Sequence, residues 1–387
     1  MQIFTVGGAV RDELLGLTVQ DRDYVVVGAT PDEMLAQGYK PVGKDFPVFL
    51  HPKTHAEYAL ARTERKSGHG YRGFAFDAAR EVTLEEDLAR RDLTINAIAR
   101  AADGALTDPF HGLADLAACV LRHVGPAFIE DPVRILRVAR FAARFYDFSV
   151  APETVGLMRQ MVESGEIDHL VAERVWQEFA RGLMEARPSR MLAVLHECGA
   201  LARLLPEVDG GGELGLALDN AARRGYALAV RFAVLLRDFP PPSAAFGAMQ
   251  QPDETARRVK RVNAVCARLK APADCRDVAL LVARHDKDIV RGAQLAGSDL
   301  AKLLETTDAL RRPQRFMHLL EAAVRHADGA DQADAGGLFM RALAAARAVD
   351  AATIARDCSD ARQIAERVQA ARVAAVEAAL KLPEQEK

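Results

Sequence analysis

The sequence predicts an α+β protein, in which a small mixed sheet near the N-terminus is followed by a long all-helical part. Up to about Asp108, short runs of β-branched and aromatic residues alternate with helical patterns. Beyond Gly210-Gly211-Gly212 the chain is rich in Ala, Leu and Arg and helical in pattern. A length of 387 residues is more than one hydrophobic core usually organises, so we expect two or three domains.

The overall composition is that of an ordinary globular protein. Half of the residues are apolar and 27% are charged. We expect neither a membrane span nor a signal peptide, because the sequence has no apolar run near 18 residues and no basic-then-apolar start. The five cysteines are scattered without Cys-x-x-Cys spacing, which favours reduced thiols in a cytoplasm over structural zinc. With a net charge of −3, a nucleic-acid partner would have to be bound by local basic patches.

The run from Val19 to Val27 carries two acidic residues at the entrance to a predicted strand. The run ends in Tyr24-Val25-Val26-Val27, residue types that favour a strand. Asp21 and Asp23 are two residues apart, so on a strand both carboxylates point to the same side. They could be two solvated aspartates, but paired carboxylates also hold Mg²⁺ together with substrate phosphates. Asp21 and Asp23 are therefore our candidate metal ligands.

A glycine pair precedes these aspartates by just over a dozen residues. The apolar run Ile3-Phe4 leads into Gly7-Gly8, and a helical pattern follows. Glycines allow close backbone approach, a helix start offers free N–H groups, and Arg11 adds positive charge. This order of elements is typical of a turn that binds phosphate, and together with the aspartates it predicts one site.

The remainder of the N-terminal region contains further candidate elements. We predict a short helix from Pro31 to Gln37, capped by Thr30, and strands at residues 48–50 and 57–61. Glu57 is a candidate third carboxylate facing the metals, although a solvent-facing strand glutamate fits equally well. Residues 62–73 are rich in Gly and positive charge, and we interpret them as a mobile loop near the nucleotide or a nucleic-acid backbone, or simply as a solvated surface loop.

A polar cluster occurs within an apolar pattern from Leu84 to Ile98 that predicts a helix. On such a helix Asp92 and Asn96 share a face, and Arg91 lies close to them. The cluster could be a buried network that ties the helix to the sheet. It could equally hold the sugar and triphosphate of a nucleotide.

A stripe of arginines follows the helix-start signal Asp131-Pro132. A helix would place the arginines on one broad face and apolar residues on the other. A solvated charged stripe usually mixes both signs, whereas guanidinium groups suit phosphates and base edges. The stripe consists of Arg134, Arg137, Arg140 and Arg144.

Five ordered motifs resemble those of the class II tRNA nucleotidyltransferases, the bacterial and eukaryotic CCA-adding enzymes, and the first two also resemble the wider superfamily related to DNA polymerase β. They are Gly7-Gly8-Ala-Val-Arg11-Asp12, Asp21-Arg-Asp23, Arg90-Arg91-Asp92-Leu-Thr-Ile-Asn96-Ala, Glu130-Asp131-Pro-Val-Arg134 and Glu173-Arg174-Val-Trp-Gln-Glu178. The likeness extends from Met1 to roughly Glu207 and is strongest to proteobacterial members. It implies a catalytic polymerase-β-like head over residues 1–125, a helical neck over residues 126–207, and a helical, tRNA-binding body and tail over residues 208–387.

The resemblance implies that the chain adds C, C and A to tRNA 3′ ends, using CTP and ATP and two Mg²⁺ ions held by Asp21 and Asp23. From the sequence we expect no membrane, and we infer no obligate protein partner. A poly(A) polymerase, a CC-only or A-only enzyme, and a tRNA-binding chaperone with an inactive site remain alternatives. The expected nucleotide contacts are Gly8, Arg11, Arg91, Asp92, Asn96, Asp131, Arg134, Arg137 and Arg140.

The C-terminal half departs from the family pattern at one place. Longer proteobacterial relatives carry a metal-dependent phosphohydrolase there, with His and Asp ligands. This chain has Arg237-Asp238 where the His-Asp pair is expected, and His285-Asp286 is a dipeptide alone. We therefore expect a degenerate His-Asp region without bound metal.

Overall fold

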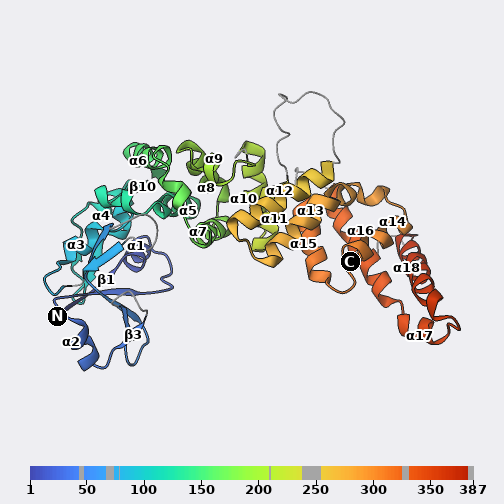
Figure 1. Cartoon of the computed structure of the whole chain (residues 1–387), viewed down its shortest axis with the longest axis horizontal. Helices are drawn as coiled ribbons and strands as arrows, with labels where there is room; N and C mark the ends of the chain where they lie inside the picture. The colour runs from blue at the N-terminus through green and yellow to red at the C-terminus, as the bar shows by residue number, and fades with distance from the viewer. Residues whose placement is uncertain are drawn as a thin grey trace. The chain divides into compact units, whose positions relative to one another are not determined.

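The computed structural model describes residues 1–42, 48–66, 74–77, 79–208, 211–237, 254–324 and 331–381. The chain divides into two compact units, Met1–Pro206 and Glu207–Lys387. Strands occur in unit 1, whereas the described part of unit 2 is helical, which confirms the α+β prediction (Figure 1). Within the described residues, no helix is both long and apolar enough to span a membrane.

Unit 1 contains a mixed sheet of seven strands in the order β3-β4-β5-β2-β1-β8-β9. Neighbours pair antiparallel except β2 and β5, which run parallel. Two further strand pairs are β6–β7 and β10–β11. The strands are β1 (Gln2–Val6), β2 (Asp23–Val27), β3 (Lys40–Val42), β4 (Val48–Leu50), β5 (Glu57–Leu60), β6 (Thr63–Lys66), β7 (Phe74–Asp77), β8 (Ala99–Ala101), β9 (Leu106–Thr107), β10 (Val120–Leu121) and β11 (Ser149–Val150).

Apolar residues that alternate along β2 belong to two separate cores. Val25 packs in a cluster with Val6 and Leu88, and Val26 packs with Met34 and Phe49. Because side chains alternate across a strand, the two clusters lie on opposite faces of the sheet. Asp23, two residues before Val25, therefore extends the face that carries the Leu88 cluster.

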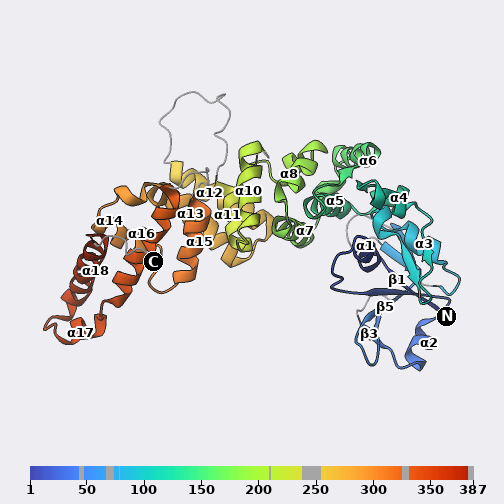
Figure 2. The same ribbon diagram turned by 180° about the vertical axis from the view of Figure 1, so that it is seen from behind.

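Two helices of unit 1, α2 and α3, begin at capping boxes formed by threonine and glutamate. The prediction of a helix after Thr30 is confirmed, since the Thr30 side chain accepts from the N–H of Glu33 in a capping box. The helices are α1 (Gly8–Leu14), α2 (Pro31–Ala36), α3 (Leu84–Ala89), α4 (Gly112–Ala117), α5 (Val133–Arg144), α6 (Pro152–Glu163), α7 (Ala172–Met184), α8 (Pro188–Glu197) and α9 (Ala200–Leu204). In both views α1 lies beside β1 (Figures 1 and 2).

Two expectations about unit 1 are wrong. The predicted helix from Leu84 to Ile98 ends at Ala89, because the Asp92 carboxylate accepts from the backbone N–H of Leu93 and Leu93 is extended. A short 3₁₀ turn, Thr94–Asn96, then leads into β8. Within residues 62–73, Thr63–Lys66 form a strand paired with Phe74–Asp77 rather than a loop, and residues 67–73 lie outside the described part.

Unit 2 is built from packed helices. Helices α11, α13 and α15 lie side by side (Figure 2). The helices are α10 (Gly212–Arg223), α11 (Leu228–Arg237), α12 (Glu254–Leu269), α13 (Ala273–Arg291), α14 (Gly297–Thr306), α15 (Pro313–Ala323), α16 (Asp331–Ala348), α17 (Ala351–Arg356) and α18 (Ile364–Lys381).

Two arginines, Arg237 and Arg258, form the polar contacts in the region expected to be a degenerate His-Asp site. Arg237 is buried, and its Nη1 donates to the carbonyl of Ala322 at 2.9 Å. Arg258 forms two 2.7 Å bonds with the carboxylate of Asp286. Asp238 lies outside the described residues. Among those that are described, no group of three or more His, Cys, Asp or Glu side chains is arranged to hold a metal.

Candidate active site

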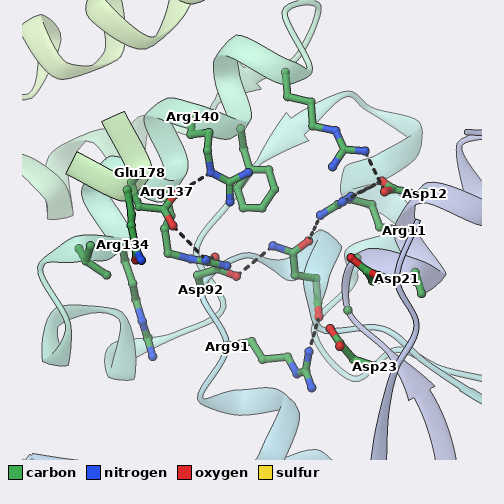
Figure 3. Close-up of a pocket in the computed structure, with 18 of the residues that line it drawn as sticks. Arg11, Asp12, Asp21, Asp23, Arg91, Asp92, Arg134, Arg137, Arg140 and Glu178 are labelled. Carbon is green, nitrogen blue, oxygen red and sulfur yellow. Dashed lines mark hydrogen bonds and ion pairs between the residues drawn. The ribbon is translucent and has the colours of Figure 1, made fainter. Parts of the chain in front are cut away.

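A pocket of about 860 Å³ lies within unit 1, in the size range of small-molecule sites. Its walls come from the turn between β1 and α1, the approach to β2, the segment after α3, and helices α5 and α7. All of the predicted site residues line it except Glu57. Figure 3 shows how the charged side chains converge.

The turn between β1 and α1 requires glycine for two reasons. Gly7 has a φ of 69°, in the left-handed region that disfavours other residues. A Cβ on Gly7 would also lie 2.8 Å from Nη1 of Arg91. Gly8 begins α1, and a Cβ there would approach Nη2 of Arg11 at 3.4 Å. The glycines thus let the backbone pass close to two of the arginines that line the pocket.

Asp21 and Asp23 lie next to each other at the edge of the pocket (Figure 3). Asp23 is the first residue of β2, opposite Val6 of β1. Desolvation raises the pKa of the Asp23 carboxyl; the positive charge of Arg91 opposes this shift, and the negative charge of Asp21 adds to it. In the described part of the chain neither aspartate forms an ion pair with a basic residue. The two carboxylates therefore fit a divalent cation, whose other ligands would come from substrate phosphates or water.

Glu57 begins β5, one strand away from Asp23. The parallel register pairs Tyr24 with Tyr58, so Glu57 stands level with Asp23 across the two strands. Its side chain is exposed and does not line the pocket. The structure thus brings Asp21 and Asp23 together but not Glu57, whose role as a third carboxylate stays a prediction.

Asp92 and Asn96 form a buried chain of hydrogen bonds that reaches both ends of the pocket. Nη1 of Arg11 donates to Oδ1 of Asn96 at 2.5 Å, and Nδ2 of Asn96 donates to Oδ1 of Asp92 at 3.0 Å. Nε of Arg137 donates to Oδ2 of Asp92 at 2.7 Å. Burial pushes the pKa of Asp92 upward, but Arg137 and the hydrogen bonds outweigh it and hold that pKa well below its usual range. The predicted buried network exists, and it also lines the pocket.

The arginines of α5 point to acids that the sequence analysis did not assign. Nε of Arg140 donates to Oε2 of Glu178 at 2.6 Å, and Nη2 of Arg144 donates to Oδ2 of Asp12 at 2.8 Å. Glu178 also lies 3.6 Å from Nη1 of Arg137. Eight arginines and seven acidic residues line the pocket: Arg11, Arg90, Arg91, Arg134, Arg137, Arg140, Arg144 and Arg174, with Asp12, Asp21, Asp23, Asp92, Asp131, Glu178 and Glu185. The near balance explains how so many guanidinium groups share one site.

Asp131 and Arg134 each contact other groups. The carboxylate of Asp131 accepts from both terminal nitrogens of Arg174, at 3.1 and 2.7 Å, and from the N–H of Val133 at 3.1 Å. The guanidinium of Arg134 donates to the carbonyls of Ala127 at 2.8 Å and Arg90 at 2.6 Å. Arg174 stood in a recognised motif, but nothing in its spacing indicated that it would bind Asp131.

Comparison with known proteins gives concordant matches. Residues 3–122 match the family described as the poly A polymerase head domain, and residues 147–210 match a probable RNA and SrmB-binding site of polymerase A. The "Multifunctional CCA protein" of Dechloromonas aromatica is 57% identical over 405 residues, covering 99% of this chain and 98% of that protein. The protein of the same name from Azoarcus sp. is 57% identical over 400 residues, covering 98% of this chain and 97% of that one.

Solved structures share the fold at lower sequence identity. An apo form of a CCA-adding enzyme matches with a TM-score of 0.72 and 21% identity, over 97% of this chain and 88% of that one. The Thermotoga maritima CCA-adding enzyme complexed with tRNA_CCA matches with a TM-score of 0.69 and 20% identity, over 100% of this chain and 88% of that one. At these identities the likeness concerns the fold.

Proposed function

Because the chain belongs to the family of multifunctional CCA proteins, we infer that it adds C, C and A to the 3′ ends of tRNA without a nucleic-acid template, using CTP and ATP. It is a CCA tRNA nucleotidyltransferase, and each addition releases pyrophosphate. The observation that carries this conclusion is the Asp21–Asp23 pair at the edge of an arginine-lined pocket, in a chain that matches its relatives from end to end.

Nucleotidyltransferases of this family depend on divalent metal, and we propose Mg²⁺ held by Asp21 and Asp23. Two neighbouring carboxylates that form no salt bridge in the described chain are hard oxygen donors of the kind that Mg²⁺ prefers. When bound, the metal would lower the pKa of the primer 3′-OH and neutralise charge on the triphosphate.

The free thiols of all five cysteines support a reducing compartment, and we propose the cytoplasm.

The remaining work of the site is alignment of the α-phosphate and neutralisation of charge. We propose that Gly8, Arg11, Arg91, Arg137 and Arg140 contact the nucleotide, since all of them line the pocket. Each of the four arginines already contacts a carboxylate of the protein, so a triphosphate would compete with these carboxylates for the guanidinium groups. Asp92 and Asn96 hold Arg137 and Arg11 in place through the buried chain of hydrogen bonds.

Nucleotide choice is proposed to rest on Asp131 and Arg134. Cytosine and adenine both present a donor amine beside an acceptor ring nitrogen, whereas uracil and guanine present the reverse. A carboxylate accepts and a guanidinium donates, so this pair fits C and A. The two bonds from Arg174 keep the carboxylate of Asp131 oriented, which supports the proposal. A second reading is that Asp131 only caps α5 through the N–H of Val133, while Arg134 binds phosphate.

We further propose the division into a catalytic head (residues 1–125), a neck (126–207) that reads the nucleotide, and a body and tail (208–387) that bind tRNA. A-form RNA hides its base edges, so the helical parts would recognise shape and phosphates. The test is incubation of tRNA lacking its 3′ CCA with each nucleotide, resolved to single additions. CTP should add two residues, and ATP one more after them. A long ladder with ATP alone would instead identify a poly(A) polymerase, and C-only or A-only products a partial enzyme.

A further inference from the structure

Among the described residues that line the pocket, Phe141 on α5 is the only aromatic one. Its side chain is 4% exposed. The pocket around it consists mainly of arginines and acids, so a large apolar ring there calls for an explanation beyond filling a core.

Three guanidinium groups from two segments of the chain gather on this ring. The Cζ atoms of Arg140, Arg11 and Arg137 lie 4.5, 5.1 and 5.7 Å from the centre of the Phe141 ring. All three distances lie within the roughly 6 Å range in which a cation is attracted to a ring face. Phe145, one turn further along α5, stacks nearly parallel to Phe141 at 6.2 Å and lies 5.1 Å from the same Arg11.

Each of the three guanidinium groups also contacts a carboxylate. Arg11 pairs with Asp12, Arg137 with Asp92, and Arg140 with Glu178. The carboxylates contribute charge, and the ring contributes a neutral, negatively polarised surface that needs no counter-ion. A triphosphate that competes with these carboxylates leaves the contacts to the ring intact, because the ring has no group that phosphate could replace.

We propose that Phe141 is a positioning residue, whose ring holds Arg11, Arg137 and Arg140 together so that all three can bind the triphosphate of one nucleotide. The inference rests on the proposed function and deepens it. Ring contacts of this kind act equally on the bound nucleotide and on the transition state. Their loss should therefore raise KM for CTP and ATP while kcat changes little.

The test replaces Phe141 with phenylalanines carrying one, two or three ring fluorines, which weaken the negative ring face with little change in shape. We expect KM and the equilibrium dissociation constant for CTP and ATP to rise with each fluorine, reaching about tenfold at three. Phe179 on α7 is the matched control: it is 1% exposed, and in the described structure no guanidinium lies over its ring. Fluorination at Phe179 should leave both constants unchanged.

A pair of ordinary variants provides an independent comparison. Phe141→Leu and Phe179→Leu each remove a buried ring, so both should lower the melting temperature. Only Phe141→Leu should raise the dissociation constants of CTP and ATP, by about tenfold or more. A flat fluorine series at Phe141, or an equal rise at both positions, would show that the ring serves packing alone and overturn the inference. Wild-type protein that binds CTP but extends no tRNA would count against the proposed function instead, and the binding series would still decide the role of the ring.

Discussion

The proposed metal ligands Asp21 and Asp23 give the clearest prediction for single residues. Replacing either aspartate with asparagine should abolish nucleotide addition, because the site loses a ligand of the cation that neutralises the triphosphate. The loss should be several kcal/mol of barrier, or roughly a thousandfold in rate. Melting temperature and tRNA binding should hardly change, since neither aspartate has a salt-bridge partner in the described chain. Rates come from single-nucleotide extension assays.

Glu57→Gln is the informative companion to these variants. A loss equal to that of Asp23→Asn would support Glu57 as a third carboxylate, and near-normal activity would make it a solvent-facing strand residue. Substantial activity in Asp21→Asn or Asp23→Asn would place the metal elsewhere in the protein.

Base selection provides the second prediction for individual residues. Asp131→Ala and Arg134→Ala should lower the use of CTP and ATP sharply and narrow their margin over UTP and GTP. A site built on such charged pairing rejects the wrong base by roughly 10⁴-fold, because its polar groups are then left unmatched. The measurement is kcat/KM for all four nucleotides in each variant. If all four decline in parallel and the preference for C and A persists, Asp131 serves only as a cap and Arg134 as a phosphate contact.

Sequence spacing predicted much of the grouping of residues in the pocket, but it could not predict all of it. The Gly7-Gly8 turn and the two aspartates were expected to form one site, and they line one pocket. Asp12 lies on α1, Glu178 on α7 and Glu185 directly after α7, and their positions opposite the arginines depend on how helices pack. Periodicity places a charge on a face of a helix, but it does not say which charge of another helix will lie opposite.

The segment after α3 shows how one side chain can decide where a helix ends. Apolar spacing favoured a helix through Ile98, but Asp92 bonds to the N–H of Leu93 and the helix stops at Ala89. This turn places Asp92 between Asn96 and Arg137. Propensity patterns miss such a turn because a single local hydrogen bond, not an average over the helix, decides it.

Asp92 makes the stability of unit 1 sensitive to acid. Its pKa is lowered in the folded protein, so its stabilising contribution is present above the unfolded pKa of about 3.9 and is lost as pH falls toward the folded value. We expect Asp92→Asn to destabilise unit 1 at pH 7 by about 3 kcal/mol or less, since Arg137 is partly exposed. Fluorescence of Trp176, the single tryptophan, reports urea unfolding of this unit. The difference from wild type should shrink below about pH 4, whereas a difference that stays constant with pH would contradict the assignment.

The helices of unit 2 carry a prediction about an activity that should be absent. Arg237 is permanently charged and bonded to the carbonyl of Ala322, at the place where a neutral imidazole would bind a cation. Asp286 is already paired with Arg258 through two bonds. We expect no hydrolysis of 2′,3′-cyclic AMP stimulated by Ni²⁺ or Mg²⁺. The assay uses the Asp21→Asn variant to exclude the nucleotidyltransferase site, and hydrolysis that survives in this variant would refute the prediction.

At the scale of the whole molecule, the order of composition along the chain was enough to predict the fold class. Short β-like runs come first, and helical patterns follow to the end. The weakly negative net charge did not indicate a nucleic-acid partner, because the basic residues act locally: in the pocket of unit 1 most arginines are balanced by acids. Net charge is therefore a poor guide to RNA binding when cations are concentrated in one site and balanced by acids within it.

The division into two units leads to the last prediction. Every residue that lines the pocket belongs to unit 1, Met1–Pro206, which contains its own sheet and hydrophobic clusters. A protein of residues 1–206 should therefore fold cooperatively and bind CTP and ATP with affinities within about threefold of the full chain. It should lose most tRNA affinity and CCA addition, since the proposed body and tail supply phosphate contacts to the RNA.

Three measurements compare the truncated protein with the full chain. Trp176 fluorescence reports folding, nucleotide binding gives the affinities for CTP and ATP, and filter binding at several salt concentrations gives the affinity for tRNA. Electrostatic contacts with RNA phosphates are weakened by salt, so the full chain should lose affinity more steeply with salt than the truncated one. If the truncated protein binds and extends tRNA as well as the full chain, then unit 2 contributes nothing to RNA recognition. If it folds but fails to bind nucleotides, the pocket of unit 1 depends on unit 2 for its shape.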